Sequence, residues 1–246
     1  MTVESARDHD ARHSSDKAHK RAPVAQNLSR HDLTPTIRPM DPLSLHPEFV
    51  RTARRVSKPL AVAMETVGPP AWPTRHQQPL ARYLARVVVG QQLSTRAAST
   101  IWGRVEALGK AENQSVPGLA LLLPDTALLG CGLSAGKLKT LKALAEAEAA
   151  GELRRQRLAR LTPEARASAL TALRGVGPWT ADMLAIFYFR DPDIWPLGDL
   201  AVRKTFERYL ADQRRYDLSS AAALFAPHRS VLALYLWRIA DNPPDR

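Results

Sequence analysis

Cysteine is almost absent from this chain, since Cys131 is the only one among 246 residues. A disulfide framework, or a metal cluster held by cysteines alone, is therefore impossible within one chain. No apolar run reaches the roughly 20 residues needed to span a membrane, and the N-terminal residues lack the uninterrupted apolar core of a secretory signal. Alternating strand patterns and internal repeats are missing too. These absences indicate a helical protein of a reducing compartment.

Acidic residues are too few to balance the basic ones: 35 Lys and Arg face 24 Asp and Glu, a net charge of +11. Such a surplus fits a polyanionic partner, most simply nucleic acid, although a generic basic protein stays an alternative. Residues 1–45 are polar and carry seven basic and six acidic residues, so they add only +1. We expect them to form a disordered tail. Four histidines lie there at a spacing that matches no metal motif: His9, His13, His19 and His31.

Residues 46–246 show apolar spacings of three and four, which predict an all-α domain. Ser94, Ser134 and Thr162 precede such runs and are expected to be helix N-caps. We expect the helices to cover residues 47–56, 60–67, 79–89, 95–108, 117–130 (one or two helices), 135–150, 165–173, 180–189, 199–210, 218–225 and 231–240.

The most distinctive stretch is LRGVGPWTA at 173–181, between two apolar runs. Gly175 and Gly177 flank Val176, and glycine adopts turn conformations that a Cβ resists. Pro178 suits the first position of a following helix. The pattern predicts helix, hairpin and helix, with the backbone N–H groups of 175–179 facing outward to bind a phosphate. An ordinary helix–helix corner is the alternative.

Asp199 lies twenty residues after Trp179 and is expected to begin a helix. The positive end of that helix favours an ionised carboxylate. Such a carboxylate can stabilise positive charge on a sugar, or orient or deprotonate a water molecule. A purely capping role is the alternative, and the two are compatible. Asp182, Asp191 and Asp193 are weaker candidates, because a first turn or a loop commonly holds Asp for local reasons.

Aromatic side chains make up only 6% of the sequence, yet four are candidates for the walls of a nucleobase pocket: Trp179, Trp195, Trp237 and Tyr235. An enzyme that acts on a base holds it against aromatic or apolar walls, and an indole face attracts a cationic alkylated purine. For Trp195 and Tyr235 a core position is an equal alternative. Gln92 and Leu93 are candidates for a wedge that fills the gap left by a flipped nucleotide. The alternative there is a solvent-facing loop.

From about residue 46 onward the chain resembles the AlkA-type 3-methyladenine DNA glycosylases of the helix-hairpin-helix superfamily. The resemblance implies two helical subdomains with the active site in the cleft between them. It implies catalysis by Asp199, pocket walls from Trp179 and Trp237, and a wedge at Gln92 or Leu93. Five motifs carry it, in order: VVVGQQLSTRAA at 87–98, GLSAGKLKTL at 132–141, LRGVGPWTADMLAI at 173–186, WPLGDLAVRK at 195–204 and PHRSVLALYLWR at 227–238.

The resemblance also implies a monovalent cation, Na⁺ or K⁺, held by the backbone carbonyls of Thr171, Leu173 and Val176. No other cofactor is expected, because Cys131 alone cannot hold the four-cysteine iron–sulfur cluster of endonuclease III-like relatives. Relatives that also cut the strand carry Lys where this chain has Trp179, and that Lys forms a Schiff base. The small β-rich domain that precedes some relatives is expected to be missing.

The expected function is therefore that of a monofunctional, monomeric DNA glycosylase that flips and excises alkylated purines from duplex DNA in base excision repair. Its expected location is the bacterial cytoplasm with its nucleoid, or the nucleus. A glycosylase for uracil, hypoxanthine or etheno adducts is one alternative. A non-catalytic module that grips DNA through the hairpin is the other, and it would need no carboxylate facing an aromatic pocket.

Overall fold

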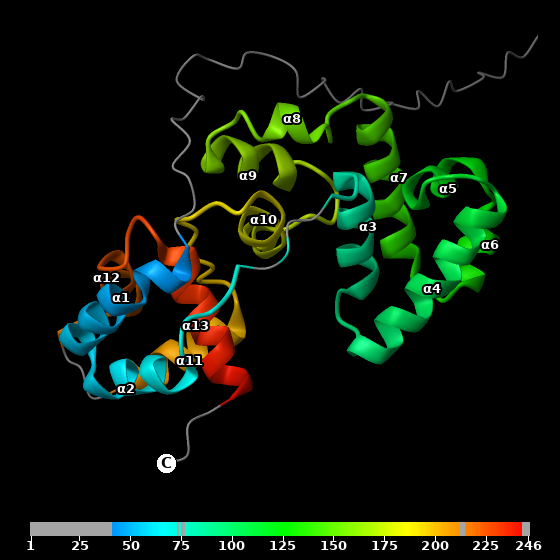
Figure 1. Cartoon of the computed structure of the whole chain (residues 1–246). Coiled ribbons are helices and arrows are strands. Elements are labelled where there is room, and N and C mark those ends of the chain that lie inside the picture. The colour runs from blue at the N-terminus through cyan, green and yellow to red at the C-terminus, as the bar shows by residue number, and fades with distance from the viewer. Residues whose placement is uncertain (1–40, 73, 75–76, 212–214, 243–246) are drawn as a thin grey trace, which may run out of the picture.

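The structure is a computed structural model that describes residues 41–72, 74, 77–211 and 215–242. Every regular element in these residues is helical, as predicted. The helices form two lobes with separate cores (Figure 1). Their bounds are α1 (Pro42–Val56), α2 (Lys58–Val67), α3 (Leu80–Gly90), α4 (Thr95–Ala111), α5 (Val116–Leu122), α6 (Asp125–Gly130), α7 (Ala135–Ala149), α8 (Arg155–Leu158), α9 (Pro163–Thr171), α10 (Pro178–Met183), the π-helical segment η2 (Leu184–Phe189), α11 (Leu200–Leu210), α12 (Leu218–Ala223) and α13 (Arg229–Asp241).

The first lobe contains α3 to α9, with α7 packed against α3, α5 and α6. The expected N-caps explain where three of the helices begin. Ser94, Ser134 and Thr162 each accept a hydrogen bond from the backbone N–H three residues on, at 3.3, 3.3 and 3.1 Å. Each cap satisfies a donor that the first helical turn leaves unpaired.

The second lobe joins the two ends of the described chain. Helices α1 and α2 lie beside α11, α12 and α13, so blue and red segments meet at the lower left of Figure 1. Phe49 from α1, Phe206 from α11 and Tyr235 from α13 are buried in this core. The lobe is therefore discontinuous in sequence, and the first lobe is inserted between its halves.

The second helix of the hairpin is shared by the two lobes. Ala181, Leu184 and Tyr188 belong to the first core, whereas Met183 and Ile186 belong to the second. Between Thr180 and Tyr188 this segment has apolar residues on nearly all sides, which explains why it is buried between the lobes. Its latter half is the π-helical η2, and such wider turns occur often at functional sites. The hairpin therefore lies at the boundary between the lobes.

The predicted tail boundary at residue 45 is wrong, because α1 begins at Pro42. Asp41 caps the helix by accepting the Leu43 N–H at 3.2 Å, and Leu45 is buried in the second core. The predicted boundary rested on the polar composition averaged over 45 residues, and this average did not reveal the short capping sequence at Asp41 and Pro42. The rest of the predicted tail, including its four histidines, lies outside the described residues. The single turn α8 was not expected, and it contains only four residues.

Candidate active site

The carboxylate of Asp199 lies at the start of α11 and accepts three hydrogen bonds. Its Oδ1 accepts the backbone N–H of Val202 at 3.0 Å and the indole Nε1–H of Trp237 at 3.0 Å. Its Oδ2 accepts the indole Nε1–H of Trp179 at 2.8 Å. Only 9% of the residue is exposed. Asp199 is thus a helix cap, as its position predicts, and a buried carboxylate oriented by two indoles.

The two tryptophans reach Asp199 from different parts of the fold. Trp179 is on α10, directly after the hairpin, and 41% of it is exposed. Trp237 is on α13 and packs on Phe187 with ring centroids 5.3 Å apart. The structure therefore brings together three of the predicted site residues. The exposed face of Trp179 is available to a flat ligand beside the carboxylate.

Of the two other predicted pocket residues, Tyr235 is a core residue and Trp195 is partly buried against the second core. Tyr235 is fully buried, stacks on Phe49, and its hydroxyl lies 2.5 Å from His46 Nδ1. Burial also raises the pKa of the Tyr235 hydroxyl above its ordinary value. Trp195 packs edge-on against Phe206 with centroids 5.5 Å apart. The prediction of Tyr235 as a pocket wall is therefore wrong, and Trp195 supports α11 by packing on it.

The hairpin packs against α7 through its first glycine. Gly175 has φ +78°, and a Cβ there would overlap the Thr140 side chain. Val176 is buried, and its N–H donates to the Leu173 carbonyl at 3.1 Å. That N–H therefore closes the turn and is not free for phosphate, contrary to expectation. A Cβ on Gly177 would meet no atom within 4 Å, so this glycine leaves open space at the surface.

The predicted wedge residues lie in the loop between α3 and α4. Gln92 is exposed with φ +57°, and Leu93 is 38% exposed. Lys137 fixes the loop, because its Nζ donates to the carbonyls of Val89 and Gln91 at 2.8 and 2.9 Å. The Gln91 amide also lies 3.4 Å from the Gly175 carbonyl oxygen. The loop and the hairpin are therefore neighbours.

A hollow of about 660 Å³ lies between α3, α4 and Trp179. Its apolar and aromatic lining includes Leu93, Tyr83, Val87 and Trp102. Sequence reasoning missed Tyr83 and Trp102, which looked like ordinary members of a helical apolar pattern. The Nε1–H of Trp102 is buried and has no hydrogen-bond partner among the described residues. Hollows of this size commonly accept small ligands.

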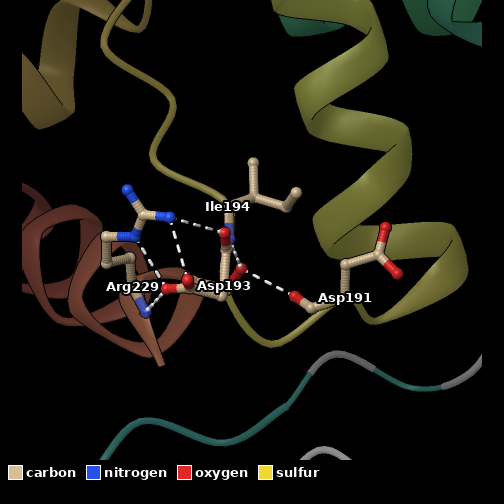
Figure 2. A network of polar contacts seen from close by, with 5 residues as sticks. Asp191, Asp193, Ile194 and Arg229 are labelled. Carbon is tan, nitrogen blue, oxygen red and sulfur yellow. Dashed lines mark hydrogen bonds and ion pairs between the residues drawn. The ribbon is translucent and has the colours of Figure 1, made fainter. Parts of the chain in front are cut away.

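Two of the three rival carboxylates form ion pairs with arginines. Asp191 forms an ion pair with the buried Arg166. Asp193 forms one with Arg229 (Figure 2). Burial raises the pKa of Asp182, on α10, from 3.8 to about 6. Neither of the two paired carboxylates is bonded to the tryptophans that hold Asp199.

The structure adds two findings on metals and membranes. Among residues 41–72, 74, 77–211 and 215–242, no group of three or more His, Cys, Asp or Glu is arranged to hold a metal ion. No helix in those residues is long and apolar enough to cross a membrane.

Several known proteins are similar to this chain, although no model of a protein family matches it. "DNA-3-methyladenine glycosylase 1" of Schizosaccharomyces pombe is 32% identical over 161 residues, which are 63% of this chain and 70% of the relative. The "probable bifunctional transcriptional activator/DNA repair enzyme AlkA" of Mycobacterium tuberculosis is 31% identical over 66% of this chain, but only 34% of that longer protein. A solved structure of S. pombe 3-methyladenine DNA glycosylase (Mag1) in complex with abasic DNA matches with TM-score 0.65 and 26% identity, covering 78% of this chain and 98% of that one.

Proposed function

The chain belongs to the DNA-3-methyladenine glycosylase family, and from this membership we propose that it flips alkylated purines out of duplex DNA and hydrolyses their N-glycosidic bond. This reaction is a step of base excision repair. The observation that carries the proposal is the buried carboxylate of Asp199, held on both oxygens by Trp179 and Trp237. A module that only grips DNA has no need of such a carboxylate.

In this proposal Asp199 stabilises the positive charge that develops on the deoxyribose as the base departs. Glycoside hydrolysis uses carboxylates against the same oxocarbenium-like charge, and a group fixed in advance costs no reorganisation during the reaction. Three hydrogen bonds occupy three of the roughly four lone-pair positions of the carboxylate. One position remains to orient the attacking water. The fixed negative charge, rather than proton transfer, is therefore its main contribution.

The surrounding elements supply the other parts of the reaction. Trp179 forms a wall for the flipped base, and the adjoining hollow provides space for it. Gln92 or Leu93 fills the gap in the duplex, and the hairpin at 175–177 contacts the DNA backbone. The carbonyls of Thr171, Leu173 and Val176 would hold a monovalent cation that neutralises a DNA phosphate. Leu173 accepts one N–H, and its carbonyl keeps a second lone pair for such an ion.

We propose a monofunctional enzyme that acts as a monomer, in the nucleoid or the nucleus. Trp179 stands where strand-cutting relatives carry the lysine that forms a Schiff base, and an indole cannot form one. The product is then an intact strand with an abasic site, cut only after alkali or heat. Borohydride is expected to trap no covalent enzyme–DNA adduct, and efficient trapping would contradict this part of the proposal.

The test is base release from duplexes that carry N-methylpurines, ethenoadenine, hypoxanthine or uracil, with Asp199→Asn as the matched variant. Asn also caps helices well, so the fold is kept while the charge is lost. We expect wild-type release of methylpurines and a loss of about 10²–10³ in rate in the variant. Release of another lesion alone would reassign the substrate. DNA binding without release of any base would favour the gripping module.

A further inference from the structure

The loop 190–198 connects η2 to α11 and ends at Asp199, and its first half is bound to the start of α13. Arg229 is the first residue of that helix, and its side chain holds Asp193 at two points. Nε donates to Asp193 Oδ1 at 2.7 Å, and one terminal nitrogen donates to Oδ2 at 2.8 Å. The Arg229 backbone N–H adds a third bond, to Oδ1 at 3.1 Å. Figure 2 shows this pair. A bidentate arginine–carboxylate pair fixes orientation as well as distance.

Ser230, the next residue, binds the same loop through three hydrogen bonds and is fully buried. Its hydroxyl donates to the Asp191 carbonyl at 2.7 Å and accepts the Ile194 N–H at 2.9 Å. Its backbone N–H donates to the Pro192 carbonyl at 3.0 Å. Four successive loop residues, 191–194, are thus bonded to two residues of α13.

The other end of the loop is bound to the same helix. Trp237 lies seven residues after Ser230, a rise of about 10 Å along an α-helix, and it donates to Asp199 Oδ1. Between these points the loop is stiffened by a turn in which the Asp199 N–H donates to the Pro196 carbonyl at 2.9 Å. Helix α13 therefore spans the loop and contacts it at both ends.

We propose that Arg229 and Ser230 are positioning residues for Asp199, which fix the start of the loop so that the carboxylate at its end meets both indoles and the reacting sugar. This inference rests on the proposed function. A displacement of about 1 Å in a catalytic group can cost 10²-fold in rate. Burial raises the pKa of Asp193, but the hydrogen bonds from Arg229 outweigh it and the net pKa is lowered. The pair therefore stays ionised at neutral pH.

The kinetic test compares Arg229→Gln and Ser230→Ala with the wild type under single-turnover conditions. We expect excision rate constants about tenfold to a hundredfold lower, with DNA dissociation constants within about threefold, since one charge at most is lost. Arg229→Lys keeps the charge but not the planar fork, so we expect it to restore only part of the rate. Arg54→Gln is the control, because Arg54 pairs with Glu65 between α1 and α2 and does not touch the loop.

The second readout needs no activity. The ¹⁵N–¹H indole signals of Trp179 and Trp237 report their hydrogen bonds to Asp199. The Asp199→Asn variant shows where both signals lie when the acceptor carries no charge. We expect Arg229→Gln and Ser230→Ala to shift both signals while that of Trp102 stays in place. Unchanged indole signals together with a normal excision rate would overturn the inference. It would also be overturned if thermal melts showed that the variants are unfolded and that this accounts for the loss of rate. An inactive wild type would refute the proposed function, and the indole signals would still decide the positioning.

Discussion

At the scale of single residues, Trp179 combines two physical roles that one pair of substitutions can separate. Its Nε1–H orients Asp199, and its exposed face is the proposed wall for the base. Trp179→Phe keeps an aromatic wall and loses the N–H, so excision of every substrate should fall by a similar factor. Trp179→Ala loses both roles. A desolvated cation over an indole is worth up to about 2 kcal/mol, so Ala should penalise cationic methylpurines beyond neutral lesions.

The measurement is the ratio of single-turnover rates on a 7-methylguanine duplex and on a hypoxanthine duplex. Trp102→Phe is a control, because this indole lines the hollow but does not contact Asp199. Equal ratios for Trp179→Phe and Trp179→Ala would show that the face of Trp179 does not read substrate charge.

Asp182 gives a pH-dependent prediction. Burial raises its pKa from 3.8 to about 6 in the folded protein, so the folded state holds this proton more tightly than the unfolded chain does. The contribution of Asp182 to stability is then complete below about pH 4 and is lost as pH rises to about 6. Asp182→Asn removes that loss. After allowance for solvent screening of a partly exposed group, we expect its melting temperature to exceed the wild type by about 2–4 °C at pH 8 and by less at pH 4.

Thermal melts of the wild type and of Asp182→Asn at pH 4 and pH 8 measure this difference. Asp217→Asn is a contrasting variant, because hydrogen bonds from Ser220 lower the pKa of this exposed carboxylate. The Asp217 charge already contributes most of its stability at pH 4, close to the unfolded pKa of about 3.9, so Asp217→Asn should show no gain over the wild type between pH 4 and pH 8. An Asp182→Asn gain that is equal at pH 4 and pH 8 would show that the effect is not electrostatic.

Which residues could be predicted from sequence depends on how local their interactions are. The caps Ser94, Ser134 and Thr162 act on an N–H three residues away, so consecutive residues contain the whole signal. Tyr235 instead depends on His46, 189 residues distant. No pattern within α13 distinguishes its buried ring from that of Trp237 two residues later. The contacts of both tryptophans with Asp199 likewise needed coordinates.

At the scale of elements, the two glycines of the hairpin are predicted to differ. Gly175 has a positive φ and no room beside Thr140, whereas a Cβ on Gly177 meets nothing within 4 Å. Gly175→Ala should therefore lower the free energy of unfolding by at least about 1–2 kcal/mol. Gly177→Ala should leave it within about 0.5 kcal/mol. Its added methyl group should instead weaken DNA binding severalfold, because backbone N–H groups bind phosphate at close range.

Chemical denaturation and binding to an abasic duplex measure the two effects separately. Gly130→Ala is a matched control, since a Cβ there also meets nothing within 4 Å and Gly130 lies at the end of α6, away from the hairpin and Asp199. If Gly177→Ala binds DNA normally, the hairpin is only a corner between helices. Sequence alone predicted the hairpin as a unit but could not assign these separate roles, because the neighbour Thr140 lies on another helix.

At the scale of the whole molecule, the arrangement of lobes was predictable only through the resemblance. Apolar spacing indicates that each helix has a buried face but not which helix covers it. The shared segment α10–η2 is an example, since Leu184 and Ile186 are two residues apart and enter different cores. The discontinuous second lobe could not be predicted from spacing for the same reason, because α1 and α13 meet through side chains that are far apart in sequence.

Net charge gives the prediction at this scale. Residues 46–246 contain +10 of the total of +11, and the proposed contacts are with the DNA backbone. If about 4–6 phosphates are neutralised, the slope of log K against log salt should be roughly −4 to −5.

Arg174 is exposed at the hairpin, so Arg174→Gln should make the slope shallower by about 1. In Arg54→Gln the lost charge was already paired with Glu65, so its slope should match the wild type. Fluorescence anisotropy of a labelled abasic duplex between about 50 and 200 mM salt covers the needed range, and a wild-type slope near zero would contradict electrostatic binding.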